Sequence, residues 1–104
     1  MQTVPYADPL TDEELARALH GLDGWERSGD AITRTIVTGG FRQAVALVGA
    51  VAEVAEAADH HPDVCITRYR RVTFTLTTHA ANAVTRRDVE LATEIDRLAR
   101  EADG

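Results

Sequence analysis

Lysine is absent from this chain of 104 residues, and serine and cysteine each occur only once. Without lysine, the chain has neither a Schiff-base nucleophile nor the lysine of a P-loop. Ser28 lies in a Gly/Asp-rich turn, which is not the strand-to-helix turn that presents the nucleophile of a serine hydrolase. Cys65 has no partner for a disulfide within the chain, so we expect a reducing, cytoplasmic location.

Long apolar runs and clusters of basic residues are also missing. No apolar run approaches the roughly 18 residues that span a bilayer, and residues 1–5 lack the charged and apolar regions of a signal peptide. The formal net charge is −6, and the eleven basic residues, all arginine, are mostly scattered. Because phosphate backbones are held by clustered basic side chains, we expect no nucleic-acid partner and no membrane partner.

The length of 104 residues favours a single domain over 1–104, with a loose arm at 1–9. Within it, three segments have helical patterns. Thr11 and Glu14 form a capping-box pattern, which predicts a helix over 12–20. Apolar residues recur at helical spacing over 41–58. A second capping-box-like pair, Thr85 and Asp88, predicts the start of a last helix.

Strand patterns lie between these helices. Residues 25–27 and 32–37 flank a short Ser-Gly-Asp loop and predict a hairpin. Residues 66–78 are rich in β-branched side chains, and from residue 72 apolar residues alternate with threonines. By strand parity His79 would point with the threonines, away from the apolar face, if the strand stays regular that far. The resulting order predicts an α+β domain with helices on one face of an antiparallel sheet.

Three of the four histidines form a candidate site. His60 and His61 follow the central helix, and His79 follows the last strand pattern. Glu56 and Asp59 lie within a turn of the pair, where carboxylates can orient imidazole rings. Imidazole exchanges protons near neutral pH, so the cluster favours acid/base chemistry such as a dehydration.

Plainer interpretations stay open at this point. Adjacent histidines at the end of a helix often cap its carbonyl groups, and Asp88 is equally well explained as a helix cap. Zinc is less favoured because adjacent ligands suit one tetrahedral ion poorly. Arg68, Arg70 and Arg71 fit an anion clamp, although solvated charges at a strand edge explain them more simply.

The spacing of these residues resembles a family signature. The pattern is similar to the motif of pterin-4a-carbinolamine dehydratases. In this chain it consists of Glu56, three residues, His60-His61-Pro62, six residues, Tyr69, nine residues, His79, eight residues and Asp88. Gly24-Trp25 and Phe41 with Ala44 extend the likeness over nearly the whole chain. Many members have five residues between the proline and the aromatic, so the six here predict a β-bulge.

The resemblance implies a fold, an activity and an assembly. It implies a four-stranded antiparallel sheet backed by three helices, in the order α-β-β-α-β-β-α, assembled as a homodimer or homotetramer. The implied reaction is dehydration of 4a-hydroxytetrahydropterin to quinonoid dihydropterin, in pterin cofactor recycling, with no metal or organic cofactor. His60, His61 and His79 would transfer the protons.

Further residues match the segments that line the family's pterin pocket. They are Pro62, Thr78, Ala80 and Ala81, and Glu56 and Asp88 are candidate supports for substrate binding. The resemblance also leaves a second possibility, a catalytically degenerate member that acts as a dimerisation or protein-binding module.

Overall fold

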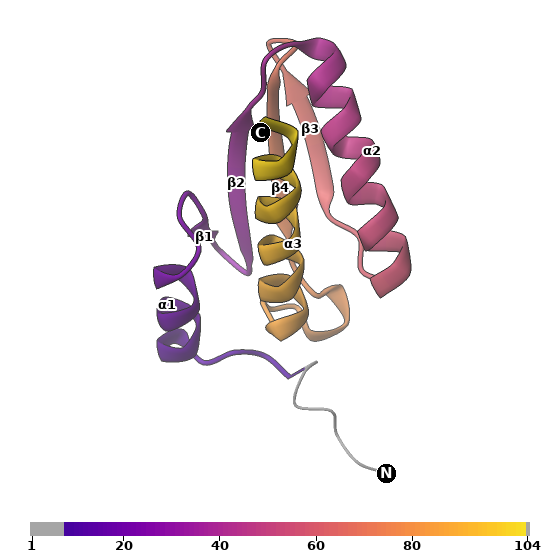
Figure 1. The fold of residues 1–104 in the computed structure, drawn as a ribbon. Coiled ribbons are helices and arrows are strands. Elements are labelled where there is room, and N and C mark those ends of the chain that lie inside the picture. The colour runs from indigo at the N-terminus through magenta and orange to yellow at the C-terminus, as the bar shows by residue number, and fades with distance from the viewer. Residues whose placement is uncertain (1–7, 104) are drawn as a thin grey trace.

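The computed structural model describes residues 8–103, so most of the predicted N-terminal arm, residues 1–7, lies outside the described part. The elements in chain order are α1 (Asp12–His20), β1 (Glu26–Ser28), β2 (Ala31–Val37), α2 (Phe41–Ala58), β3 (Asp63–Thr67), β4 (Arg71–Leu76), a 3₁₀ turn (His79–Ala81) and α3 (Arg86–Asp103). Figure 1 shows α2 and α3 side by side in front of the sheet, with α1 next to β1.

The four strands form one antiparallel sheet in the order β1-β2-β4-β3. Residues 63–67 of β3 pair one-to-one with residues 71–75 of β4, from Asp63 opposite Thr75 to Thr67 opposite Arg71. The predicted β-bulge is therefore wrong. Five of the six residues between Pro62 and Tyr69 are regular strand residues, and the sixth, Arg68, belongs to the turn.

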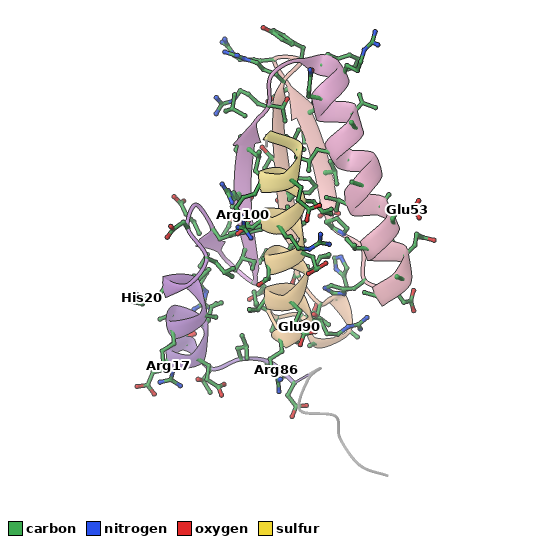
Figure 2. The ribbon with its side chains drawn as sticks, in the orientation of Figure 1. Arg17, His20, Glu53, Arg86, Glu90 and Arg100 are labelled. Carbon is green, nitrogen blue, oxygen red and sulfur yellow. The ribbon has the colours of Figure 1, made fainter. Side chains whose placement is uncertain are left out.

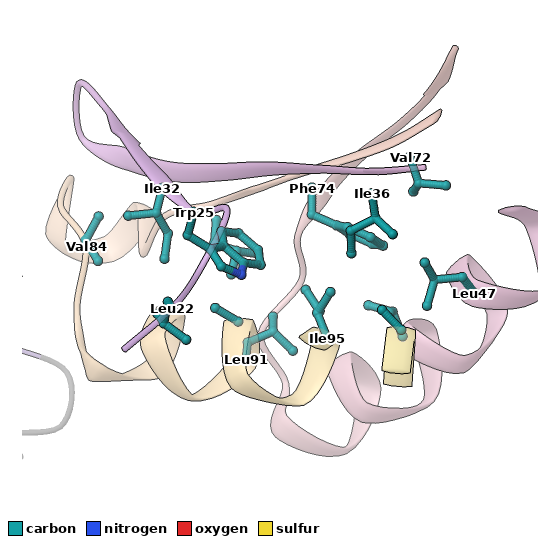
Figure 3. Packing of buried hydrophobic residues seen from close by; sticks show 14 of the residues in the cluster. Leu22, Trp25, Ile32, Ile36, Leu47, Val72, Phe74, Val84, Leu91 and Ile95 are labelled. Atoms are coloured by element: carbon teal, nitrogen blue, oxygen red, sulfur yellow. The ribbon is translucent and has the colours of Figure 1, made fainter. Parts of the chain in front are cut away.

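The helices bury one face of this sheet. Figure 3 shows Ile32 and Phe74, from β2 and β4, on the face of the sheet that α3 covers with Leu91 and Ile95, and Val72 of β4 above Leu47 of α2. The opposite face carries threonines that bond across the strands, as in the pair Thr35 and Thr73, whose hydroxyl oxygens are 2.7 Å apart. The predicted α+β class and element order are confirmed.

Local signals explain where the helices begin. In α1 the Thr11 hydroxyl accepts from the Glu14 amide, and the Glu14 carboxylate accepts from the Thr11 amide, so the predicted capping box is present. The helix at 41–58 also has its predicted bounds.

Trp25 is a core residue. It is buried, and its Nε1 donates to Asp96 of α3 over 2.9 Å.

Candidate active site

The C-terminal corner of α2 presents two histidines. Asp59 adopts the left-handed conformation, with a φ of 51°, and ends the helix. The backbone N–H of His60 donates to the Ala55 carbonyl over 3.0 Å, so the helix end is capped by main chain and not by an imidazole. Both rings are thereby left for other contacts, and Pro62 holds His61 in extended geometry.

The ring of His60 is fixed by a buried carboxylate of α3. Its Nε2 lies 2.5 Å from Oδ1 of Asp88, and both side chains are almost completely buried. Oδ2 of Asp88 accepts from the Thr78 hydroxyl and from the Thr85 backbone N–H, each at 2.9 Å. A carboxylate that accepts at both oxygens calls for a proton on Nε2 of His60. Nδ1 is then the ring nitrogen left to exchange a proton.

His61 has a carboxylate partner of a different kind. Its Nε2 lies 2.5 Å from Oε2 of Glu56, one turn back along α2, and both side chains are largely exposed. Exposed pairs of this kind add little to stability, so the main effect is to orient the ring. As with His60, the contact leaves Nδ1 as the second ring nitrogen.

His79 arrives from another part of the fold. β4 ends at Leu76, and His79 begins the 3₁₀ turn that leads to α3, so strand parity does not set its direction. The side chain nevertheless faces away from the core, as expected. The Thr78 N–H donates to the Ala83 carbonyl over 3.0 Å, which closes this turn. The His79 side chain is exposed, and its ring forms no hydrogen bond within residues 8–103.

All three histidines line one open hollow of about 220 Å³, together with Asp59, Thr77, Thr78, Ala80 and Arg87. A neighbouring apolar hollow of about 180 Å³ shares His61 and also includes Glu56 and Pro62. Ala81 and Asp88 line neither hollow. Thr78 lies at the histidine hollow, but its hydroxyl donates to Asp88. Asp88 does not line the hollow itself and acts on the site through its contact with His60.

Arg87 is a lining residue that the sequence analysis did not single out. Its Nη2 donates to the carbonyl oxygens of Ala58 and Asp59, at 3.2 and 2.8 Å. These carbonyls belong to the end of α2, where a cation complements the helix dipole. Arg87 therefore fastens the first turn of α3 to the histidine corner. Its position next to Asp88 was the only sequence signal.

Tyr69 is the one residue of the motif that lies far from the histidines. It sits in the turn between β3 and β4, while the 3₁₀ turn with His79 follows the opposite end of β4. Figure 1 shows these two turns at opposite ends of the sheet. The ring is exposed, and the Arg70 guanidinium lies 5.9 Å from its centroid.

Two further kinds of feature are absent from residues 8–103. No three histidine, cysteine or acidic side chains in this range are placed to hold a metal ion together. No helix within the same residues combines the length and apolarity needed to cross a membrane.

Comparison with known proteins gives a consistent family. The model of the family described as pterin 4 alpha carbinolamine dehydratase matches residues 8–98. A Nocardia farcinica protein provisionally named as such a dehydratase is 56% identical over 91 residues, covering 88% of this chain and 95% of the relative. A provisionally named relative from Thermomicrobium roseum is 51% identical over 90 residues, covering 86% and 96% of the two chains.

Two solved structures resemble the fold. One, described as a transcriptional coactivator/pterin dehydratase from Brucella melitensis, has a TM-score of 0.84 and 37% identity, covering 88% of this chain and 99% of its own. The other is a pterin dehydratase-like protein described as a RuBisCO assembly factor, with a TM-score of 0.60. It is 20% identical and covers 72% of this chain and 86% of its own, so it shows the shared fold alone.

Proposed function

The chain belongs to the pterin 4 alpha carbinolamine dehydratase family, and we propose that it dehydrates 4a-hydroxytetrahydropterin to quinonoid dihydropterin and water. The observation that carries the proposal is the meeting of His60, His61 and His79 at one hollow. Two of the rings are oriented by carboxylates at 2.5 Å. Oriented imidazoles suit a reaction that must deliver one proton and remove another.

The reaction balances with histidines alone. One protonated imidazole gives its proton to the 4a-hydroxyl oxygen, the carbon–oxygen bond breaks, and water leaves. A second, neutral imidazole accepts a proton from a ring nitrogen, so the substrate loses one water overall. In His60 and His61, Nδ1 is the ring nitrogen left for such a transfer, because Nε2 of each faces a carboxylate. The ring of His79 has no hydrogen-bond partner within residues 8–103, so it can serve as the acid or the base with either nitrogen.

The remaining candidate residues support this chemistry in different ways. Ala80 is at the histidine hollow, so its small side chain leaves room for a flat ring. Pro62 and Glu56 wall the adjoining apolar hollow. Asp88 and Thr78 are positioning residues for His60. Ala81 belongs to the turn that carries His79 and lines neither hollow.

The test is a stopped-flow assay in which purified protein is mixed with freshly generated 4a-hydroxytetrahydropterin. His61→Gln and His79→Gln change exposed side chains, so both variants are expected to fold. Each should slow the dehydration by roughly 10²- to 10⁴-fold, the usual contribution of a positioned acid or base. His20→Gln, on α1 and outside both hollows, is the matched control. Wild-type protein that folds but leaves the spontaneous rate unchanged refutes the proposal.

A non-catalytic dimerisation or protein-binding module is the second candidate. The similarity to the Brucella melitensis structure supports this second candidate, because that protein is described as a transcriptional coactivator as well as a pterin dehydratase. A module of this kind would tolerate His61→Gln and His79→Gln without loss of its role, and tetrahydropterin would not bind. The same two variants therefore separate the candidates.

The setting of the enzyme completes the proposal. We assign the chain to a cytoplasmic pterin-recycling step, without metal or organic cofactor, in a homodimer or homotetramer. Support for self-association comes from large apolar side chains that remain exposed in the single chain, among them Val45, Phe41 and Val64.

A further inference from the structure

A further hollow lies away from the histidines. This arginine hollow, named for Arg34 and Arg100 in its wall, has a volume of about 370 Å³, within the roughly 300–1,000 Å³ of ordinary ligand sites. Its walls are the loop between α1 and β1, the end of β2 and the last turns of α3. It shares no lining residue with the two hollows at the histidines. A ligand bound here is therefore separate from the proposed reaction.

A buried carboxylate forms part of the wall. Asp96 of α3 is 8% exposed, and its Oδ1 accepts from Nε1 of Trp25 over 2.9 Å and from Nη1 of Arg34 over 2.6 Å. Its Oδ2 has no hydrogen-bond partner within residues 8–103 and is not fully shielded from solvent. Because a carboxylate oxygen in a buried residue is costly without a donor, Oδ2 is a place for an N–H group of a ligand.

The guanidinium of Arg34 is held in place beside this carboxylate. Gly24 lies against it so closely that a Cβ on Gly24 would come within 2.8 Å of Nε of Arg34. Gly24 has a φ of 87°, a conformation that favours glycine. The Arg34 side chain is 28% exposed, and Nη2 has no hydrogen-bond partner within residues 8–103. Arg34 therefore presents a fixed donor to the hollow.

Two exposed charges of opposite sign complete the wall. Asp23 comes from the loop after α1, and Arg100 comes from the last turn of α3. Figure 2 shows Arg100 on the side of α3 that faces the β1–β2 hairpin. Neither residue forms an ion pair with the other or with any described side chain. The hollow thus offers one unpaired position for a positive group and one for a negative group.

The end of β2 adds an open strand edge. β1 pairs with residues 31–33 of β2, whereas β4 pairs with residues 32–37. Residues 34–37 therefore have no strand on their other side within the described chain, and all four line the hollow. Main-chain groups on such an edge are available both to donate and to accept hydrogen bonds.

We propose that the arginine hollow binds a free α-amino acid with an aliphatic side chain. The carboxylate of the ligand pairs with Arg100 and with Nη2 of Arg34. The ammonium group donates to Asp23 and to Oδ2 of Asp96. Both unpaired charges and both open groups of the buried pair then have a partner.

A ligand with a single charge fits this wall less well. An anion alone would face Asp23 and Asp96, and a cation alone would face Arg100, so like charges would meet in either case. The remaining side chains favour an aliphatic group on the ligand, because the hollow also includes Ile36, Val37 and Ala99. L-Leucine carries both charges and such a group, so it is the probe of choice.

The single tryptophan reports on this hollow. The Trp25 indole N–H donates to Asp96, so a ligand at Oδ2 of Asp96 changes its field, and one ¹H–¹⁵N signal follows a titration. L-Leucine at millimolar concentrations should shift this signal in a saturable manner. Leucinamide lacks the carboxylate and N-acetyl-leucine lacks the ammonium group. Each should bind about tenfold more weakly or worse, as expected for the loss of one charge-assisted contact.

Neutral variants test the two exposed contacts. Arg100→Gln and Asp23→Asn change exposed side chains, so both variants are expected to fold. Each should weaken the binding of L-leucine by about tenfold or more. Arg86→Gln and Glu90→Gln are the matched controls, because both residues are exposed and lie near the opposite end of α3 in Figure 2. The controls should bind L-leucine as the wild type does.

Several results overturn the proposal. One is a Trp25 signal that L-leucine leaves in place, and another is an Arg100→Gln or Asp23→Asn variant that binds like the wild type. N-acetyl-leucine that binds as tightly as L-leucine would make the hollow an anion site, and leucinamide that does so would make it a cation site. No pterin is present in these titrations, so their outcome is independent of the dehydratase assay.

Discussion

Asp88→Asn is the substitution that most directly probes the site. Asp88 is fully buried and accepts three hydrogen bonds, from His60, Thr78 and Thr85. In the asparagine variant one oxygen remains to accept from both threonine groups, and the new NH₂ group faces Nε2 of His60. Because an amide N–H donates, Nε2 must accept, and the ring proton moves to Nδ1. In the neutral ring, Nδ1 of His60 then already carries a proton and cannot accept one from the substrate.

The size of each effect follows from the contacts. Removing the carboxylate with Asp88→Ala leaves three buried donors without a partner, at about 1–3 kcal/mol each. That sum, about 3–9 kcal/mol, is comparable to the whole stability of a small domain. Asp88→Asn keeps the two threonine bonds in neutral form and reverses the bond to His60, and it costs about 3 kcal/mol, since neutral hydrogen bonds are weaker by about 1 kcal/mol each. The asparagine variant should fold while losing roughly 10²- to 10⁴-fold in dehydration rate.

Three measurements and a control check this reasoning. Urea unfolding gives the stability, stopped-flow mixing gives the rate, and ¹⁵N imidazole shifts report which nitrogen of His60 carries the proton. Asp96→Asn is the matched control, because Asp96 is a second buried aspartate of α3, bonded to Trp25 and Arg34 and absent from both histidine-lined hollows. It should cost stability without changing the rate.

Two outcomes would refute the reasoning on Asp88. One is a folded Asp88→Asn variant that works within about threefold of the wild-type rate. The other is a His60 ring that keeps its proton on Nε2 in the variant. Either result would mean that the buried carboxylate serves only the start of α3.

Other predictions follow from single contacts. Thr78→Val removes the hydroxyl donor to Asp88 and should cost about 1–2 kcal/mol in urea unfolding and slow dehydration, whereas Thr78→Ser should restore both. Phe74→Ala empties a fully buried position and should cost about 3–5 kcal/mol in the same unfolding experiment, with little change in the rate per folded molecule. The pKa of Glu14 is lowered below its usual 4.5 by two hydrogen bonds with Thr11. The larger effect comes from the Thr11 backbone N–H and the smaller one from the Thr11 side chain. The capping contribution of Glu14 is therefore present above pH 4.5 and is lost as pH falls through the lowered pKa, a dependence that ¹³C titration of the carboxyl detects and Glu14→Gln abolishes.

Local patterns were enough to predict the helices. The bounds of α1 and α2 match the prediction because a capping box and the helical spacing of apolar residues both act within a few positions. The order of elements followed from these patterns and from the alternation in β4. Such signals are short in range, so they survive in the sequence alone.

Strand ends were predicted less well. Asp63, Val64 and Cys65 form the first part of β3, but Asp and the preceding proline are poor strand signals, and pairing with β4 is what makes the segment extended. The end of β4 at Leu76 is set by the turn that the Thr78–Ala83 bridge closes. Both the parity of His79 and the expected bulge depended on such pairings.

The sequence by itself determined which groups this protein can use: histidines, carboxylates and a helix cap, in an order that resembles one family. Only the tertiary structure decided that Asp88 orients His60, since the two are 28 residues apart and meet because α3 lies next to α2. It also decided that the Thr78 hydroxyl donates to Asp88 and that Tyr69 lies at the end of the sheet opposite the histidines. Hydrogen-bond partners distant along the chain are chosen by packing, which no local pattern records.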